Sequence, residues 1–411
     1  MRSESLNKAS IIVWSSLILI TGLHFRTRVA DDALKTDFII IIQIIISFIA
    51  TILGFLQTDN YNKWGYGAKF VLTYIIIAFV SGVFSPYPKL VFGYSILLTG
   101  AGFLTISLIQ QASNVNDFLK LEKAWLFMAL LIIISNSIMV YFSGTPTNKD
   151  IDRLGEGITS PSMFSFLCAY ALGVSFISIR SKCLSILFWL LRLLLIALII
   201  LTKTRMPLVL CFIILFLHLL FSTKRNKIYL GIVLFSTMFS TITITALLYS
   251  FDISFVKKLF YEFNRQDPST LYTLTGRTAI WATTLKILLK NIYRCSVGYG
   301  YGISRLILNI EYSKISIAYA FHTHNYFLEH LFNMGILGLI TSLLLVIYGA
   351  KWIVNYNKLS ASYSNGFSSR AFTMMVLFYF SSITEIPLGG KINPIALVVI
   401  FYIVVLDKKL P

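Results

Sequence analysis

Charge is scarce in this sequence, and acidic charge is scarcest of all. Of the 411 residues only 13% are charged, with 17 Asp and Glu against 35 Lys and Arg, while 57% are hydrophobic. The mean hydropathy is +0.78. A soluble globular protein carries far more polar surface than this. The composition therefore excludes an ordinary soluble domain and predicts an integral membrane protein, with the lipid bilayer as its surroundings.

Cysteine is also scarce, and its placement excludes two kinds of site. The four cysteines show neither the paired spacing of a disulfide framework nor that of a zinc site; they are Cys168, Cys183, Cys211 and Cys295. The net charge of +18 does not indicate nucleic-acid binding, because cytoplasmic loops of membrane proteins collect Lys and Arg. No small-residue cleavage site follows the first apolar run, 11–23, so we expect a retained span rather than a signal peptide.

Long apolar segments are abundant. A helix crosses the bilayer with about 20 apolar residues, and twelve segments approach that length: 9–25, 37–57, 68–86, 89–111, 124–143, 162–180, 183–202, 207–222, 228–250, 326–350, 371–386 and 392–406. The loops after spans two, four, six, eight and ten are basic, with Lys120, Lys358 and Arg370 among their cations. The positive-inside rule places these loops, and both termini, in the cytoplasm.

The predicted fold is an all-α membrane protein with about twelve transmembrane helices in three parts. Residues 1–250 hold spans one to nine, and residues 323–411 hold spans ten to twelve. Between them, residues 251–322 form one long periplasmic loop, in which we expect short amphipathic helices.

Two outward-facing segments carry cations that the positive-inside rule does not explain. The turn "LTKTRMP", 201–207, places Lys203 and Arg205 on the outer face, where positive charge is disfavoured. Arg205 is therefore a candidate functional residue, although a cation that snorkels to the interface is the structural alternative. In the long loop, Thr275 is a candidate N-cap and Arg277 falls in the first turn of an amphipathic helix. A helix N-terminus with an arginine suits a phosphate, but an exposed arginine that bonds a nearby carbonyl is equally plausible.

The segment "SVGYGYG", 296–302, resembles the selectivity filter of a potassium channel. The three cations immediately upstream, within 286–294, argue against a cation pore. We expect instead that Gly298 and Gly300 mark a tight bend where the backbone approaches another group closely. A channel or transporter remains the distant alternative.

The stretch "FHTHNYFLEH", 321–330, crowds polar side chains where the long loop enters span ten. On a helix that starts near Thr323, Asn325 and Glu329 are four residues apart and can bond each other, while His324 points elsewhere. A neutral histidine can take a proton from a hydroxyl, although an interfacial anchor is the structural alternative. The histidine pair is too small a set for zinc, so we expect no metal.

Arg205, Arg277 and His324 are all predicted on the same side. Two cations suit a diphosphate and a neutral base suits a hydroxyl, which points to transfer of a group from a phosphorylated lipid to an alcohol. A sugar donor attacked in this way inverts at its anomeric carbon, and no protein nucleophile is needed.

Four segments then carry a family resemblance: "LTKTRMPLVL" at 201–210, "TGRTAIW" at 275–281, "CSVGYGYG" at 295–302 and "HTHNYFLEHLFNMGILG" at 322–338. Together they resemble the O-antigen ligase and polymerase superfamily of bacterial surface-polysaccharide enzymes. The resemblance implies an integral-membrane glycosyltransferase of the GT-C kind, without metal or other cofactor, in the bacterial inner membrane. Its donor would be a glycan on undecaprenyl diphosphate, used at the periplasmic face.

Carried over by motif, the resemblance implies that Arg205 and Arg277 hold the diphosphate and that His324 activates the acceptor hydroxyl. The expected substrate-binding or supporting residues are Lys203, Asn325, Glu329, Gly298 and Gly300. The acceptor would be the lipid A core for a ligase or a lipid-linked glycan for a polymerase, and the "HTHN" motif and the length favour the ligase. Two intramembrane charges, Arg192 and Glu385, receive no role beyond a possible structural pairing.

Overall fold

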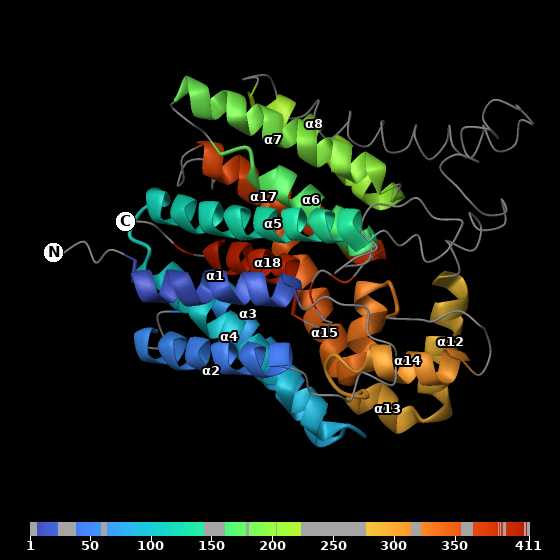
Figure 1. Ribbon diagram of the computed structural model, residues 1–411. Helices are drawn as coiled ribbons and strands as arrows, with labels where there is room; N and C mark the ends of the chain where they lie inside the picture. The colour runs from blue at the N-terminus through green and yellow to red at the C-terminus, as the bar shows by residue number, and fades with distance from the viewer. Residues whose placement is uncertain are drawn as a thin grey trace, which may run out of the picture.

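The computed structural model of the chain (Figure 1) describes most of the predicted helices. The described residues are 6–23, 38–58, 64–143, 161–177, 181–202, 204–222, 277–313, 322–354, 365–384, 386, 388, 392–406 and 408. Within these ranges the regular structure is helical and no strand occurs. The predicted span 228–250, the loop segment 251–276, Lys203, Thr275, Lys358 and Glu385 lie outside the described residues.

The helices follow the apolar runs of the sequence closely. They are α1 (Lys8–Leu23), α2 (Phe38–Gln57), α3 (Tyr66–Val83), α4 (Pro88–Gln111), α5 (Val115–Ser143), α6 (Pro161–Val174), α7 (Lys182–Leu201), α8 (Arg205–Ser222), α12 (Arg277–Lys290), α13 (Ile292–Val297), α14 (Ser304–Ser313), α15 (Tyr326–Val354), α17 (Asn365–Thr384) and α18 (Pro394–Val405).

The long helices form one bundle with two distinct ends (Figure 1). Helix α1 begins and α18 ends at one end, called here the α1 end. The short helices α12, α13 and α14 gather at the opposite end, called here the α12 end, beside the start of α15. The predicted short helices of the long loop are thus confirmed in its described part, 277–313.

Five of the described helices are long and apolar enough to cross a membrane, namely α2, α3, α4, α7 and residues Tyr326–Trp352 of α15. Four shorter apolar stretches coincide with further predicted spans: Lys8–Leu23, Ser162–Val174, Arg205–His218 and Pro394–Val405. The chain is therefore a multi-pass membrane protein, while the total of twelve spans stays a prediction.

Helix α18 forms the centre of the bundle. Its twelve residues are all buried, and it packs against α1, α3, α4, α6 and α17. A helix that is apolar all round is stable only where protein surrounds it. Helices α2 and α7, in contrast, expose large apolar side chains such as Phe48 at 60% and Leu187 at 58%. The exposed faces of these two helices therefore suit contact with lipid.

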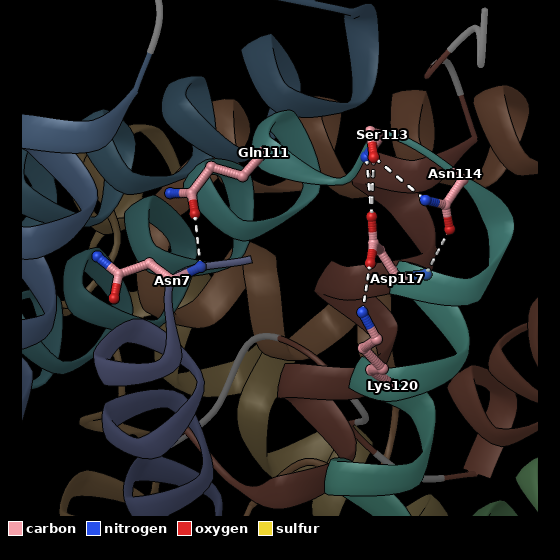
Figure 2. A network of polar contacts seen from close by, with 6 residues as sticks. All are labelled: Asn7, Gln111, Ser113, Asn114, Asp117 and Lys120. Atoms are coloured by element: carbon pink, nitrogen blue, oxygen red, sulfur yellow. Dashed lines mark hydrogen bonds and ion pairs between the residues drawn. The ribbon is translucent and has the colours of Figure 1, made fainter. Parts of the chain in front are cut away.

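Polar side chains fix the helix ends at the α1 end (Figure 2). The Asn7 amide donates to Oε1 of Gln111 at 3.2 Å, which joins the start of α1 to the end of α4. At the start of α5, Oδ1 of Asn114 accepts from the Asp117 amide at 3.2 Å, and Asp117 accepts from the Ser113 amide at 3.1 Å. Asn114 therefore caps the first turn of α5, and the Asp117 side chain satisfies the amide of Ser113, which precedes the helix.

The Asp117 carboxylate also binds Lys120 at 2.8 Å. Burial acts to raise the pKa of Asp117, but the hydrogen bonds from Lys120 and Ser113 outweigh it and hold the pKa below its usual value. The carboxylate at the start of α5 therefore stays ionised, which also suits the positive end of the helix dipole.

The prediction that Arg370 is a loop cation is wrong. It lies inside α17, is only 3% exposed, and binds the buried carboxylate of Glu122 on α5 with Nη2 to Oε2 at 2.6 Å. The Tyr402 hydroxyl of α18 donates to the same carboxylate at 2.5 Å. A buried cation needs such a partner, and the triad joins α5, α17 and α18.

Arg192 is buried, and its described partners belong to the end of α6 rather than to an acidic side chain. Its Nη2 donates to the Ser175 carbonyl at 2.8 Å, just beyond the last residue of α6. The guanidinium also lies over the Phe176 ring, 4.3 Å from its centroid. A cation at the carboxyl end of a helix complements the helix dipole, so the geometry gives Arg192 a structural role.

Candidate functional site

The "HTHN" turn, 322–325, comes directly before the first residue of α15. Oδ1 of Asn325 accepts from the Leu328 amide at 3.0 Å, the geometry of an N-cap. Helix α15 therefore starts at Tyr326, as the predicted span 326–350 does and three residues after the start near Thr323 that the spacing argument assumed. The predicted bond between the side chains of Asn325 and Glu329 is replaced by a bond between their backbones, at 2.9 Å.

His324 has a strained backbone. Its φ is 51°, and it is the one residue other than glycine with a positive φ among those described. This conformation costs a side-chain-bearing residue about 1–2 kcal/mol. The His324 amide donates to Nδ1 of His322 at 3.2 Å, and the two rings lie 3.9 Å apart. Such strain persists only where the surroundings hold it, and it is common at functional sites.

The Glu329 side chain fixes the position of this turn by a hydrogen bond to its backbone. Its carboxylate is fully buried. Oε2 accepts from the Thr323 amide at 3.0 Å, and Oε1 accepts from Nδ2 of Asn333 at 2.9 Å and from the Ser304 hydroxyl. Because both oxygens are engaged inside the protein, Glu329 shapes the site and is not placed to touch a substrate directly.

Asn333 completes the same network one turn along α15. While its Nδ2 donates to Glu329, its Oδ1 accepts from the Ser304 amide at 3.0 Å. Ser304 is the first residue of α14, so two side chains of α15 together cap the start of α14. The oxygens of Glu329 and Asn333 suit this position as acceptors, because the N–H groups at a helix N-terminus lack partners within the helix.

The glycine-rich segment docks on a kink in α15. Gly335 has φ 64° and ψ −157° in the middle of the helix, which interrupts its hydrogen bonding. The released carbonyls of Phe332 and Asn333 accept from the amides of Tyr299 at 2.9 Å and Gly300 at 2.7 Å. Buried carbonyls must find partners, and the loop supplies them.

The close approach explains why glycines stand here. A Cβ on Gly298, with φ 75°, would lie 2.4 Å from the Asn333 carbonyl oxygen, and one on Gly335 would lie 2.1 Å from that of Ser296. A Cβ on Gly300 would similarly meet Val91 of α4 at 2.4 Å. The prediction of a tight bend against another backbone is thus confirmed, and Gly298 and Gly300 face protein in these contacts.

The same loop reaches inward at Tyr301, which is fully buried. Its amide donates to the Ser81 hydroxyl of α3 at 3.0 Å, and its ring meets that of Tyr74 edge-on at 6.1 Å. Burial, followed by the charge of Glu329, raises the pKa of the Tyr301 phenol well above its ordinary value. Tyr301 therefore stays neutral and fastens the loop into the bundle.

Trp281 connects α12, which begins at Arg277, to the turn that carries His324. Its Nε1 donates to the Thr323 carbonyl at 2.8 Å, immediately before His324. Trp281 lies one turn after Arg277, the half-buried first residue of α12. The prediction that Arg277 falls in the first turn of an amphipathic helix is confirmed, and the bond brings that helix to His324.

Arg205 lies at the same end of the bundle on a separate pair of helices. It is the exposed first residue of α8, which packs against α6 and α17. The hydroxyls of Thr202 and Thr204 lie 2.8 Å apart, and Thr204 donates to the Ser165 hydroxyl of α6 at 2.6 Å. This chain of hydroxyls fixes the turn that carries Arg205; Lys203 lies outside the described residues.

Several positioning residues escaped the sequence reasoning, namely Trp281, Ser304, Thr323 and Asn333. One signal was present: Asn333 follows Glu329 by four residues in a mainly apolar helix, so both side chains share a face. Among the described residues, no three His, Cys, Asp or Glu side chains come together as metal ligands. The absence of a metal stays a prediction.

Residues 190–343 match the family model described as O-antigen ligase. This segment therefore carries the O-antigen ligase domain. The matched segment runs from α7 into α15 and includes Arg205, Arg277 and His324. An O-antigen ligase domain implies glycosyl transfer with lipid-linked glycan substrates in a membrane, without distinguishing ligase from polymerase. No curated protein matches the chain.

Proposed function

We propose that this protein transfers a glycan from undecaprenyl diphosphate to an acceptor hydroxyl at the periplasmic face of the inner membrane. The α12 end of the bundle would be that face, with both termini in the cytoplasm. The favoured acceptor is the lipid A core, which makes the protein an O-antigen ligase. The reaction inverts the anomeric carbon and uses no metal or other cofactor.

The observation that carries this proposal is the bond between Trp281 and the Thr323 carbonyl. It holds the helix that begins at Arg277 against the turn that presents His324. A cation for a departing diphosphate and a base for an attacking hydroxyl are then supplied by neighbouring segments. Catalysis by position and charge needs just such a fixed arrangement.

The proposed step moves one proton and exchanges one bond for another. The neutral His324 imidazole accepts the proton of the acceptor hydroxyl. The oxygen forms a bond to the anomeric carbon as the bond from that carbon to the phosphate oxygen breaks. The electron pair leaves with the diphosphate, so undecaprenyl diphosphate is the second product and no oxidation or reduction occurs.

Arg277 and Arg205 are proposed to stabilise the charge that the diphosphate gains on leaving. A guanidinium binds phosphate oxygens through two parallel N–H groups, which a lysine cannot reproduce. The start of α12 adds the partial positive charge of its helix dipole. Gly298, Gly300 and Glu329 take positioning roles in this proposal, and Asn325 fixes the start of α15.

The test uses the native host with the gene deleted and then restored as single variants. Arg277→Ala and His324→Ala should insert and remain stable while abolishing transfer, and Arg277→Lys should restore it only in part. Lys182→Ala, at an exposed lysine that begins α7, is the control and should transfer normally. Transfer by either of the first two variants at near the parent rate would show that the site is assigned wrongly.

The acceptor can be identified by comparing the lipopolysaccharide and the lipid-linked glycan of the deletion strain with those of the parent. Bare core, with long chains stranded on the lipid carrier, identifies a ligase. Core that carries a single repeat identifies a polymerase, the alternative within the superfamily. If neither the lipopolysaccharide nor the lipid-linked glycan changed on deletion, glycosyl transfer would be contradicted, and a transporter or channel would be the better interpretation.

A further inference from the structure

Helix α12 has an apolar side that the described part of the protein leaves exposed. Its buried side, centred on Ile287, packs against α13, α14 and α15. Leu285 is 45% exposed and Leu289 is 70% exposed. Lys286 and Lys290 are also exposed, and each follows a leucine directly, so the lysines lie about 100° around the helix from the leucines.

The uncovered apolar surface continues into α13. Ile292 is 74% exposed and Tyr293 is 53% exposed. We call Leu285, Leu289, Ile292 and Tyr293 the apolar stripe. Single exposed apolar residues are ordinary, but a contiguous group of large ones usually marks a surface that contacts a partner or a membrane.

The apolar stripe meets the end of a membrane-crossing helix. The Tyr293 ring packs edge-on against Phe84 with their centroids 6.3 Å apart, and the Arg294 guanidinium donates to the Phe84 carbonyl. Phe84 is the C-cap of α3, one of the helices long enough to span a bilayer. Val83 beside it is 68% exposed. The stripe is therefore continuous with a surface that already suits lipid.

We propose that the apolar stripe is a docking surface for the bilayer leaflet at the α12 end. In Figure 1, α12 lies across the direction of the long helices, as a helix parallel to the membrane plane would. The leucines would enter the boundary of the acyl chains, and Lys286 and Lys290 would meet anionic headgroups. A protein partner fits less well, because lysine is depleted from the centres of protein interfaces.

Docking of this kind fixes the height of the first residue of α12 above the membrane. That residue is Arg277, and under the proposed function the diphosphate of a lipid carrier lies at headgroup level. The depth of the stripe can be measured without any transfer reaction. Failure of the docking proposal therefore leaves the proposed function untouched, and the reverse also holds.

The test places spin labels on the full chain in vesicles of phosphatidylethanolamine and phosphatidylglycerol. Cys183→Ser and Cys295→Ser remove the cysteines that are not fully buried. Labels are then attached to Leu289→Cys and Ile292→Cys, with Lys286→Cys as the matched control on the same helices. Leu187→Cys on α7, whose side chain is 58% exposed, supplies the acyl-chain reference.

Collision of each label with oxygen, which concentrates in lipid, is compared with collision with a water-soluble nickel chelate. The labels at 289 and 292 should favour oxygen several-fold more than the label at 286, and should approach the reference at 187. Predominant collision with the nickel chelate at 289 and 292 would place the stripe in water and overturn the proposal. Shielding from both reagents would equally overturn it, because protein would then cover the stripe.

Discussion

At the scale of single residues, the site depends on a buried carboxylate that the substrate does not need to touch. Glu329 accepts hydrogen bonds from Thr323, Ser304 and Asn333, which belong to three successive segments of the chain. The Thr323 amide is one residue from His324, whose positive φ must be held by its neighbours. The carboxylate therefore acts on His324 through the backbone.

We predict that Glu329→Gln destabilises the protein and slows transfer together. A glutamine of the same size offers fewer acceptor sites, which leaves one of the three donors buried without a partner. Such a group costs about 1–3 kcal/mol. Thermal unfolding and the rate of glycan transfer measure the two effects. The rate should fall by about five-fold or more if the same cost falls on the transition state, since about 1.4 kcal/mol is a factor of ten.

Lys182→Gln is the control for this substitution, because Lys182 is exposed at the start of α7. It should change neither the melting temperature nor the rate. If Glu329→Gln lowered stability while the rate stayed at the parent level, the carboxylate would serve the fold alone, and the link to His324 would be wrong.

At the scale of elements, the kink in α15 and the loop that docks on it form one unit. Gly335 takes a left-handed backbone, and the amides of Tyr299 and Gly300 bond the carbonyls that the kink releases. Neither partner is stable alone, because a kinked helix exposes its carbonyls and a glycine-rich loop has little to hold it. Their contact brings the start of α14 to Glu329.

We expect Gly335→Ala to destabilise the fold by at least about 1–2 kcal/mol, the cost of a left-handed backbone for alanine. The added Cβ would also lie 2.1 Å from the Ser296 carbonyl oxygen. Unfolding of the purified protein in detergent measures the change. Gly93→Ala on α4 is the matched control, since a Cβ there meets nothing within 4 Å.

Gly93→Ala should leave the protein equally stable or slightly more so, because alanine favours helices. A melting temperature for Gly335→Ala equal to that of the control would mean that the kink is not required for stability. The α15 kink would then lose its place in the account of the site.

The helices were predictable from sequence, and the contacts between them were not. The apolar run at 37–57 predicts α2 (Phe38–Gln57) almost to the residue, because a run of bilayer length specifies its own helix. The place of Arg277 in the first turn of a helix and the tight bend at Gly298 and Gly300 were likewise predictable from neighbouring residues. The bond from Trp281 to Thr323 and the backbone of His324 depend on residues distant in the sequence, which no local pattern encodes.

At the scale of the whole molecule, polar contacts tie the bundle together at the α1 end while the candidate site occupies the α12 end. Glu122, Arg370 and Tyr402 join three helices from distant parts of the chain. The sequence pattern assigned Arg370 to a cytoplasmic loop because its acidic partner lies far away along the chain. Helix α1 begins and α18 ends at the same end of the bundle, and the assignment of that end to the cytoplasm stays a prediction.

We predict that Glu122→Gln lowers the free energy of unfolding by about 3–5 kcal/mol, because it leaves the buried Arg370 cation without its counter-charge. Detergent unfolding provides the measurement. Lys120→Gln near the start of the same helix is the comparison, because Lys120 is 59% exposed and Asp117 keeps its hydrogen bonds from Ser113. An ion pair with such an exposed cation contributes about 1 kcal/mol or less. Equal losses for the two variants would contradict the structural role assigned to the triad.

The central claim is tested most directly by transfer with the purified protein in vesicles. The vesicles contain a glycan on undecaprenyl diphosphate and an acceptor, either lipid A core or a second lipid-linked glycan. The account predicts that the parent protein moves the glycan to one acceptor and forms undecaprenyl diphosphate, unaffected by a chelator, while His324→Ala does neither. Transfer by His324→Ala at the parent rate, or activity that a chelator removes and a divalent metal restores, would contradict it.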